Sequence, residues 1–166
     1  IMDEFNPLDL VISDYQGILM FLYSTAWGDT VNLKVQCENC SHETEHPVRL
    51  SSLDFKKTTI LPVDGSFTLY LSMKKQYITK KFVPEILERD GQSVVEVKMR
   101  PLRLRDELRY QKEQSGDEKS VFRKKMIDTI DSFGGITDKS YIRGVLSIMS
   151  LLEFNKVRRF FNETEV

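Results

Sequence analysis

The sequence is poor in the side chains that bind soft metal ions. It contains two cysteines and two histidines, and all of them lie between Cys37 and His46. A single pair of cysteines two residues apart does not provide the disulfide framework of a small secreted domain, so we expect a protein of a reducing compartment. Because both histidines belong to this window, none is left elsewhere in the chain to act as a general base.

Long hydrophobic runs are also missing. The most apolar stretch near the start, residues 10–23, is interrupted by Asp14 and Gln16. It does not approach the roughly 20 apolar residues of a membrane span. The charged residues before it are acidic, unlike those of a signal peptide. We therefore expect no membrane span, and because the chain opens on Ile1 rather than methionine, we expect a fragment of a longer protein.

Charge of either sign is not in excess. The formal net charge is −1, with 30% charged and 40% hydrophobic residues. These are values of a globular protein, long enough for one domain or two small modules. They give no bulk electrostatic reason to expect nucleic acid or an anionic membrane as a partner.

Basic residues do gather locally, in 100–109, 123–125 and 158–159. Acidic residues interleave with the first run, which favours solvated helix faces with ion pairs along each helix. A docking surface for an acidic partner protein is the alternative. Nucleic acid is disfavoured because aromatic residues do not alternate with the basic ones, as base stacking would require.

The first predicted helix covers residues 8–26. Asn6 or Asp9 is its expected cap, and Gly28 is suited to the left-handed conformation that ends a helix. Apolar residues recur at steps of three and four, so we expect the helix to be buried on more than one face. From its second half we assign four side chains to the core, with an apolar patch buried against a neighbouring protein as the alternative. They are Met20, Phe21, Tyr23 and Trp27.

The rest of the chain predicts antiparallel hairpins followed by helices. The predicted strands are 31–35, 47–50, 59–62, 67–71 and 94–99, and the predicted helices are 102–114, 120–133 and 141–161. Turns are expected at 63–66 and at Asp90-Gly91, and Thr137 or Asp138 is the expected cap of the last helix. Because strands and helices are segregated, we predict an α+β fold of antiparallel hairpins packed with several helices. We divide it into modules 1–56 and 57–166, and the similarity of residues 14–19 to 140–146 leaves duplication of one module open.

One predicted hairpin carries a Cys-x-x-Cys turn at its tip. Cys37 and Cys40 would face the same side of a tight bend, where one tetrahedral ion can take both thiolates. His46 on the returning strand is the candidate third ligand and His42 the candidate fourth, which makes zinc the expected metal. Three alternatives stay open: a zinc site completed by both histidines, a site completed by another chain or by residues outside the fragment, and a metal-free remnant with reduced thiols.

Motifs for catalysis are not found. The sequence has no glycine-rich phosphate loop, Gly-x-Ser-x-Gly elbow or His-Glu-x-x-His pair. The carboxylate pairs Asp106-Glu107 and Asp117-Glu118 lie on or beside predicted helices, where acidic residues in first turns are ordinary. A thioredoxin-like role is disfavoured because the Cys turn lies between strands. We therefore expect a protein that is not an enzyme.

Several short motifs occur together in a recognisable order. They are Asp14-Tyr15, Trp27-Gly28-Asp29, the strand 31–35, Cys37-Glu-Asn-Cys40, the segment 47–53, Leu61-Pro62, the segment 97–102, Asp106-Glu107-Leu108, and Asp138 with Tyr141-Ile142-Arg143. In this combination the chain resembles the T4-like bacteriophage baseplate hub and hub-assembly proteins. Related proteins often carry a second Cys-x-x-Cys, which this chain lacks.

The resemblance implies a structural role. The protein would be a subunit of the baseplate hub of a contractile tail, assembled in the host cytoplasm and retained in the virion. Its partners would be other baseplate hub and tail proteins, and it would be oligomeric in that assembly. The alternative from another class is a cellular zinc-ribbon-like adaptor or nucleic-acid-binding module.

Overall fold

The computed structural model describes residues 5–53, 65–112 and 118–164. The chain divides into two compact units, a smaller one of Ser13–Lys57 and a larger one of Ile1–Ile12 with Thr58–Val166. The sequence-based boundary, between residues 56 and 57, lies next to this division, although the first twelve residues join the larger unit. Helices and antiparallel strands occur together, which confirms the predicted α+β class.

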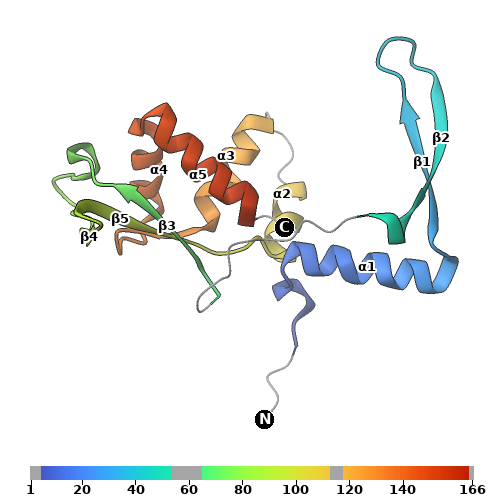
Figure 1. The fold of residues 1–166 in the computed structure, drawn as a ribbon, viewed down its shortest axis with the longest axis horizontal. Helices are drawn as coiled ribbons and strands as arrows, with labels where there is room; N and C mark the ends of the chain where they lie inside the picture. The colour runs from blue at the N-terminus through green and yellow to red at the C-terminus, as the bar shows by residue number, and fades with distance from the viewer. Residues whose placement is uncertain (1–4, 54–64, 113–117, 165–166) are drawn as a thin grey trace. The chain divides into compact units, whose positions relative to one another are not determined.

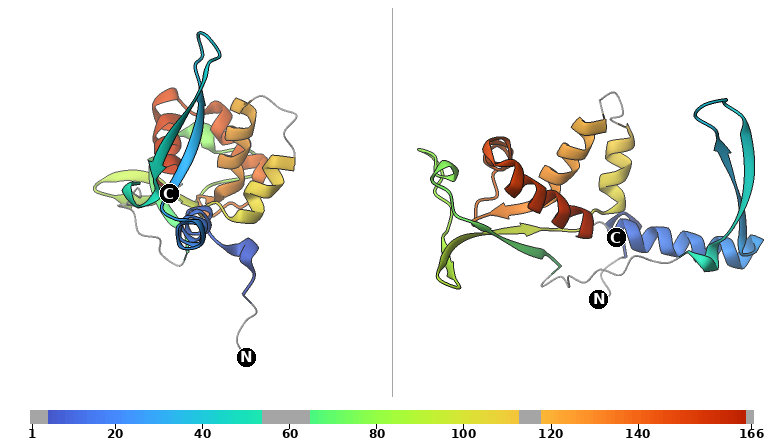
Figure 2. Two further views of the ribbon diagram at one scale, coloured as in Figure 1. Left: turned by 90° about the vertical axis from the view of Figure 1, so that its right-hand side faces the viewer. Right: turned by 45° about the horizontal axis from the view of Figure 1, so that its top comes forward.

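In the larger unit, the described residues form a four-stranded antiparallel sheet with helices against it. Its elements are β3 (Phe67–Ser72), β4 (Leu87–Arg89), β5 (Gln92–Met99), α2 (Leu104–Lys112), α3 (Glu118–Thr129), β6 (Ile130–Phe133), α4 (Lys139–Ile148) and α5 (Leu151–Thr164). β5 is central, with β3 along one edge and β4 and β6 sharing the other. Figures 1 and 2 show α3, α4 and α5 gathered on one side of this sheet.

The turn at Asp90-Gly91 is confirmed and joins β4 to β5. Both residues have positive φ, 52° and 72°, as the tight turn of a two-residue hairpin requires. β3 pairs with β5, from Phe67 opposite Met99 to Ser72 opposite Val94. The strand predicted at 59–62, and with it most of its turn, lies outside the described residues.

The core of the larger unit lies between the sheet and the helices. Tyr77 is fully buried and packs edge-on against Phe133, with ring centroids 5.3 Å apart. Its hydroxyl donates to buried Glu153 at 2.9 Å, and its carbonyl accepts from the Tyr141 hydroxyl at 2.7 Å. The buried polar groups are therefore paired, as a stable interior requires.

Two of the predicted helices are wrong, one at its end and one in its middle. The helix predicted at 120–133 stops at Thr129, and Ile130–Phe133 is strand β6. The local sequence of these residues permits either a helix end or a strand. They form a strand because they pair with the free edge of β5. The helix predicted at 141–161 is two helices, because Met149 is extended (φ −65°, ψ 142°) between α4 and α5.

The predicted caps of this region are partly confirmed. Asp138 caps α4, accepting from the backbone N–H groups of Ser140 at 2.8 Å and Tyr141 at 3.0 Å. Ser150 starts α5, and its hydroxyl accepts from the N–H of Glu153 at 3.4 Å and lies 3.0 Å from that side chain. This serine–glutamate pair resembles a capping box and was not predicted.

The smaller unit contains most of α1 (Ile12–Trp27) and the hairpin of β1 (Thr30–Gln36) and β2 (Glu43–Arg49). The helix starts later than predicted, because Pro7–Asp9 forms a separate 3₁₀ turn capped by Asn6. Gly28 ends α1 with φ +101°, as predicted. Figure 1 shows the two strands as a long hairpin.

The prediction that α1 is buried is wrong. No residue of α1 is buried, and the side chains of Phe21 and Trp27 are 68% and 76% exposed. The apolar periodicity of the helix is present, but burial also needs a second surface, and the described residues of the unit do not provide one over this helix. None of the described helices has both the length and the hydropathy needed to cross a bilayer.

Candidate functional site

The Cys-x-x-Cys turn is a closed loop at the tip of the β1–β2 hairpin. Strand pairing extends to Gln36 and Glu43. Beyond it, the N–H of Cys37 donates to the carbonyl of His42 at 2.9 Å, and the N–H of Ser41 donates back to the carbonyl of Cys37 at 2.8 Å. Ser41 has φ +56°, which reverses the chain. The positions of both thiols are therefore set by backbone hydrogen bonds.

The thiol of Cys37 lies where a negative charge is stabilised. Backbone N–H groups of Cys40 and then Asn39 donate to its sulfur, and the Cys40 thiol lies beside it, so the pKa of Cys37 is below its ordinary value. The thiolate is the form that binds metal ions. Both cysteines are reduced and exposed. The turn therefore has the arrangement of a two-thiolate metal ligand.

His46 is not brought to the thiols, whereas the backbone of His42 lies opposite Cys37 at the turn. His46 is paired with Leu33, which lies four residues before Cys37 on β1, about 13 Å along a strand that rises about 3.3 Å per residue. Its Nε2 atom lies 3.1 Å from the hydroxyl of Thr44. Among the described residues, no group of three or more ligating side chains can hold a metal. One chain therefore assembles Cys37 and Cys40, without His42 and His46 as the third and fourth ligands.

One face of the hairpin is mostly apolar. Val31, Leu33 and Val35 alternate along β1, and Val48, His46 and Thr44 lie opposite them in that order. Residues opposite each other in an antiparallel pair share a face. The side chains of Leu33 and Val35 are each 49% exposed. Cys37 is the next residue of the same alternation, so this hairpin face (Val31, Leu33, Val35, Thr44, His46 and Val48) leads directly to the first thiol.

Asp29 fixes the base of the hairpin. Its carboxylate accepts from the backbone N–H of Ser51 at 2.8 Å and from the Ser51 hydroxyl. Its carbonyl accepts from the N–H of Leu50 at 2.8 Å. The Ser51 hydrogen bonds hold the pKa of Asp29 below its ordinary value. From the sequence, Asp29 was named only as part of a helix end. An acidic residue before a strand is common, so the sequence does not show that its carboxylate binds Ser51.

The surface of α1 is the largest run of exposed apolar side chains in the smaller unit. Asp14 is the one charged residue in the helix. The side chains of this α1 surface are Ile18, Leu19, Phe21, Leu22, Tyr23 and Trp27. Beside it, an open hollow of about 280 Å³ is lined by α1 residues together with Asp29, Leu50 and Ser51. Such a surface is suited to contact with another protein.

No protein-family model matches the chain, and neither a curated protein nor a solved structure matches it. The resemblance to baseplate hub proteins therefore stays a prediction from sequence motifs.

The basic residues near α2 pair with carboxylates of the same unit. Arg100 binds Asp106 through two hydrogen bonds of 2.6 and 3.1 Å, and the N–H of Arg103 donates to the same carboxylate at 3.1 Å. Arg105 pairs with Asp9. These pairs favour the interpretation of this run as internal ion pairs, although they join separate segments rather than turns of one helix. The burial of Asp106 was not predicted.

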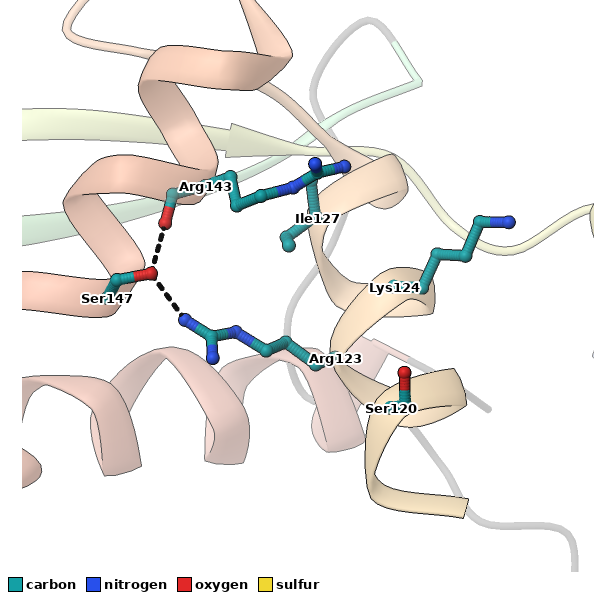
Figure 3. A pocket seen from close by; sticks show the side chains of 6 residues that line it. All are labelled: Ser120, Arg123, Lys124, Ile127, Arg143 and Ser147. Atoms are coloured by element: carbon teal, nitrogen blue, oxygen red, sulfur yellow. Dashed lines mark hydrogen bonds between the residues drawn. The ribbon is translucent and has the colours of Figure 1, made fainter. Parts of the chain in front are cut away.

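A second basic cluster borders an open hollow of about 320 Å³ between α3 and α4. Arg123 donates to the hydroxyl of Ser147 at 2.6 Å, and Ser147 donates to the carbonyl of Arg143 at 2.8 Å (Figure 3). Lys124 and Ile127 complete one side. The lining side chains are cationic, hydroxyl or aliphatic, so they do not form an acid–base pair for catalysis.

Proposed function

We propose that the chain is a non-enzymatic structural or assembly subunit in the baseplate hub of a contractile phage tail, acting through protein–protein contacts. The observation that carries the proposal is α1, a helix whose large apolar side chains are exposed on several sides. A helix that is apolar around much of its circumference is normally a covered helix. The covering surface would be an apolar face of another hub or tail protein.

The energetics favour such a contact. Burying apolar surface is worth about 25 cal/mol per Å², and large aromatic side chains such as Trp27 and Phe21 contribute most to protein interfaces. In the isolated chain most of this free energy of burial is not gained, because Trp27 and Phe21 are 76% and 68% exposed. A subunit that is stable through its larger unit can therefore present the α1 surface to a partner.

The ionisable groups of the larger unit also favour a structural role. Asp106 is held by Arg100, and Tyr110 donates to Asp128 at 2.7 Å. Burial, followed by the Asp128 hydrogen bond, raises the pKa of Tyr110. These groups are used in tertiary ion pairs and hydrogen bonds, where shifted pKa values serve stability. The choice of a tail hub among assemblies rests on the sequence motifs.

The proposal is tested in particles made by the genome that encodes this chain. Contractile tails are purified by density gradient from the intact genome and from a deletion of this coding sequence, and the chain is quantified by mass spectrometry. We expect a fixed copy number per tail and no complete tails from the deletion. Complete, contractile tails from the deletion would reject the role.

The zinc-ribbon-like adaptor or nucleic-acid-binding module is the second candidate. It is favoured by the Cys37–Cys40 turn, whose backbone N–H groups face a sulfur. Binding of labelled single-stranded and duplex oligonucleotides discriminates the two. Affinity that falls steeply with salt and is lost in Cys37→Ser would favour this candidate, whereas the tail proposal predicts no such binding.

A further inference from the structure

The Cys turn provides half of a tetrahedral metal site. Cys37 and Cys40 are exposed at the same turn, and backbone hydrogen bonds between Cys37, Ser41 and His42 close that turn. Structural zinc sites are almost always closed by four protein ligands, and pairs of cysteines at this spacing are their commonest building unit.

The other half is not supplied by the residues of this sequence. It has no cysteine or histidine beyond those at positions 37, 40, 42 and 46. His46 is about 13 Å from Cys37 along the strand, and the described residues contain no ligating group of three or more. A second copy of the chain carries an identical pair of thiols, which is the number of ligands still needed.

The hairpin face beside the turn is suited to a second copy of itself. A two-fold axis places each residue against the same surface of the partner, so any charge there would meet its like. The hairpin face carries four apolar side chains together with Thr44 and His46, and it has no lysine, arginine or carboxylate. Lys34 and Glu45 pair with each other at 3.9 Å on the opposite face. The contact therefore brings no lysine, arginine or carboxylate against its like.

The tetrahedral coordination geometry of zinc is compatible with the two-fold symmetry of a pair of identical chains. A tetrahedron has two-fold axes that exchange its corners in pairs, so two identical turns can each supply two corners. We infer that two copies of this chain share one Zn²⁺ ion, each supplying the thiolates of Cys37 and Cys40, with their hairpin faces packed together. This inference does not depend on the proposed tail function.

The small size of the contact makes the metal necessary. Four apolar residues per chain are far fewer than the roughly 20 on each side of a standard stable interface. The hairpin face alone is therefore too small to hold a dimer, and dimerisation should follow zinc.

The test uses the full chain, reduced with a phosphine and stripped of metal with a chelator. Zn²⁺ is added in steps while the mass is followed by analytical ultracentrifugation and bound metal by mass spectrometry. We expect a monomer to become a dimer that holds one zinc for each two chains. Replacing zinc by Co²⁺ should give the visible spectrum of a four-thiolate tetrahedral site.

Matched variants assign the ligands. Cys37→Ser and Cys40→Ser should each weaken zinc-induced dimerisation by on the order of a hundredfold or more. The double variant His42→Ala/His46→Ala should keep one zinc for each two chains, because neither imidazole is a ligand. Lys34→Ala, altered on the opposite face of the same hairpin, should keep both the dimer and the metal stoichiometry. Because the cobalt spectrum is read on the unaltered chain, a variant that fails to fold does not remove the test.

Four outcomes would overturn the inference. They are one zinc per chain in a monomer, loss of zinc in the histidine variant, a dimer that survives removal of metal, and no zinc bound at all. Tail incorporation of the chain is measured separately, so failure of the zinc dimer and failure of the tail proposal are distinguishable.

Discussion

Asp106 is the residue on which the ion pairs around α2 converge. Its side chain is 5% exposed, and it accepts two hydrogen bonds from the Arg100 guanidinium and one from the N–H of Arg103. A bidentate pair of this kind is strong because it satisfies both oxygens. Removing one partner leaves the other charge partly buried without compensation.

Asp106→Asn should therefore destabilise the chain by about 3 kcal/mol. The change keeps the shape of the side chain and removes the charge that Arg100 faces. The measurement is urea unfolding followed by circular dichroism. The matched control is Arg159→Gln, which breaks an exposed i,i+4 pair with Glu163 and should cost less than about 0.5 kcal/mol. Equal costs for the two variants would contradict this account of Asp106.

Acid should weaken the fold through the same carboxyl. Burial raises the pKa of Asp106, but hydrogen bonds from Arg100 and Arg103 outweigh burial and hold it below its ordinary value. The unfolded chain then takes up the proton first, so this contribution is present above the ordinary pKa of about 3.9 and is lost as pH falls through the folded pKa.

The pH dependence is measured as the free energy of unfolding between about pH 6 and about pH 3. It should fall with decreasing pH in the unaltered chain and fall less in Asp106→Asn. An identical pH dependence in the two proteins would show that Asp106 is not a source of it.

Some residue roles were predictable from sequence and others were not. The cap at Asp138, the helix end at Gly28 and the turn at Asp90-Gly91 follow from local backbone rules, and the structure confirms them. Asp106 also lies in the first turn of a helix, so locally it looked like any acidic residue there. Its burial depends on Arg100 from the preceding strand end, which local sequence does not reveal.

At the scale of elements, β6 shows what decides an ambiguous segment. Ile130–Phe133 fits the end of a helix as well as a strand, and it becomes a strand because β5 offers an open edge. Directly after it, Gly134 has φ +55° and its carbonyl accepts from the N–H of Glu85 at 2.9 Å. The close approach of this segment to residues 84–85 fixes the end of β6.

Gly134→Ala should be more destabilising than Gly135→Ala. Both glycines have positive φ, so each substitution carries a strain of about 1–2 kcal/mol. A Cβ at Gly134 would also lie 2.5 Å from the Cβ of Pro84, whereas at Gly135 the nearest atom is 3.7 Å away. We expect an additional cost of about 1–3 kcal/mol at Gly134, measured by thermal and urea unfolding. Equal losses would indicate that the segment can move aside.

The two strands of the hairpin were predicted from sequence, but the position of His46 relative to the Cys turn was not. The sequence predicted strands at 31–35 and 47–50, and the structure confirms both, with β2 beginning earlier than predicted, at Glu43. The register places Cys37 in line with Val31, Leu33 and Val35. Sequence alone suggested His46 as the third ligand because it sits on the strand that returns from the Cys turn. Strand geometry carries it away from the turn, which local spacing does not show.

At the scale of the whole molecule, the two units differ in how they are stabilised. Every buried side chain among the described residues belongs to the larger unit. The smaller unit has a regular helix and hairpin without a core of its own. The apolar pattern that predicted a buried α1 was wrong about its burial, because the described residues of its unit supply no surface that covers the helix.

The double variant Phe21→Ser/Trp27→Ser should separate folding from assembly. Because both side chains are exposed, the free energy of unfolding should change by less than about 0.5 kcal/mol. Incorporation into tails should fall by at least about tenfold, as expected for loss of aromatic anchors at an interface. The readouts are urea unfolding of the isolated chain and its copy number in purified tails.

Leu151→Ser/Leu152→Ser is the control for that variant. These residues are 75% and 70% exposed on α5 of the larger unit, so the change removes a similar exposed apolar pair elsewhere. It should leave incorporation unchanged. Loss of incorporation in this control, with the α1 variant unaffected, would move the contact surface to the larger unit.

The most direct measurement of the central claim compares the isolated chain with the chain in purified tails by hydroxyl-radical footprinting. Trp27 is the sole tryptophan of the chain and is 76% exposed, so its oxidation reports on the α1 surface. The account predicts rapid oxidation of Trp27 and Phe21 in the isolated chain and strong protection of both in the tail. Equal oxidation rates in the two states would contradict it.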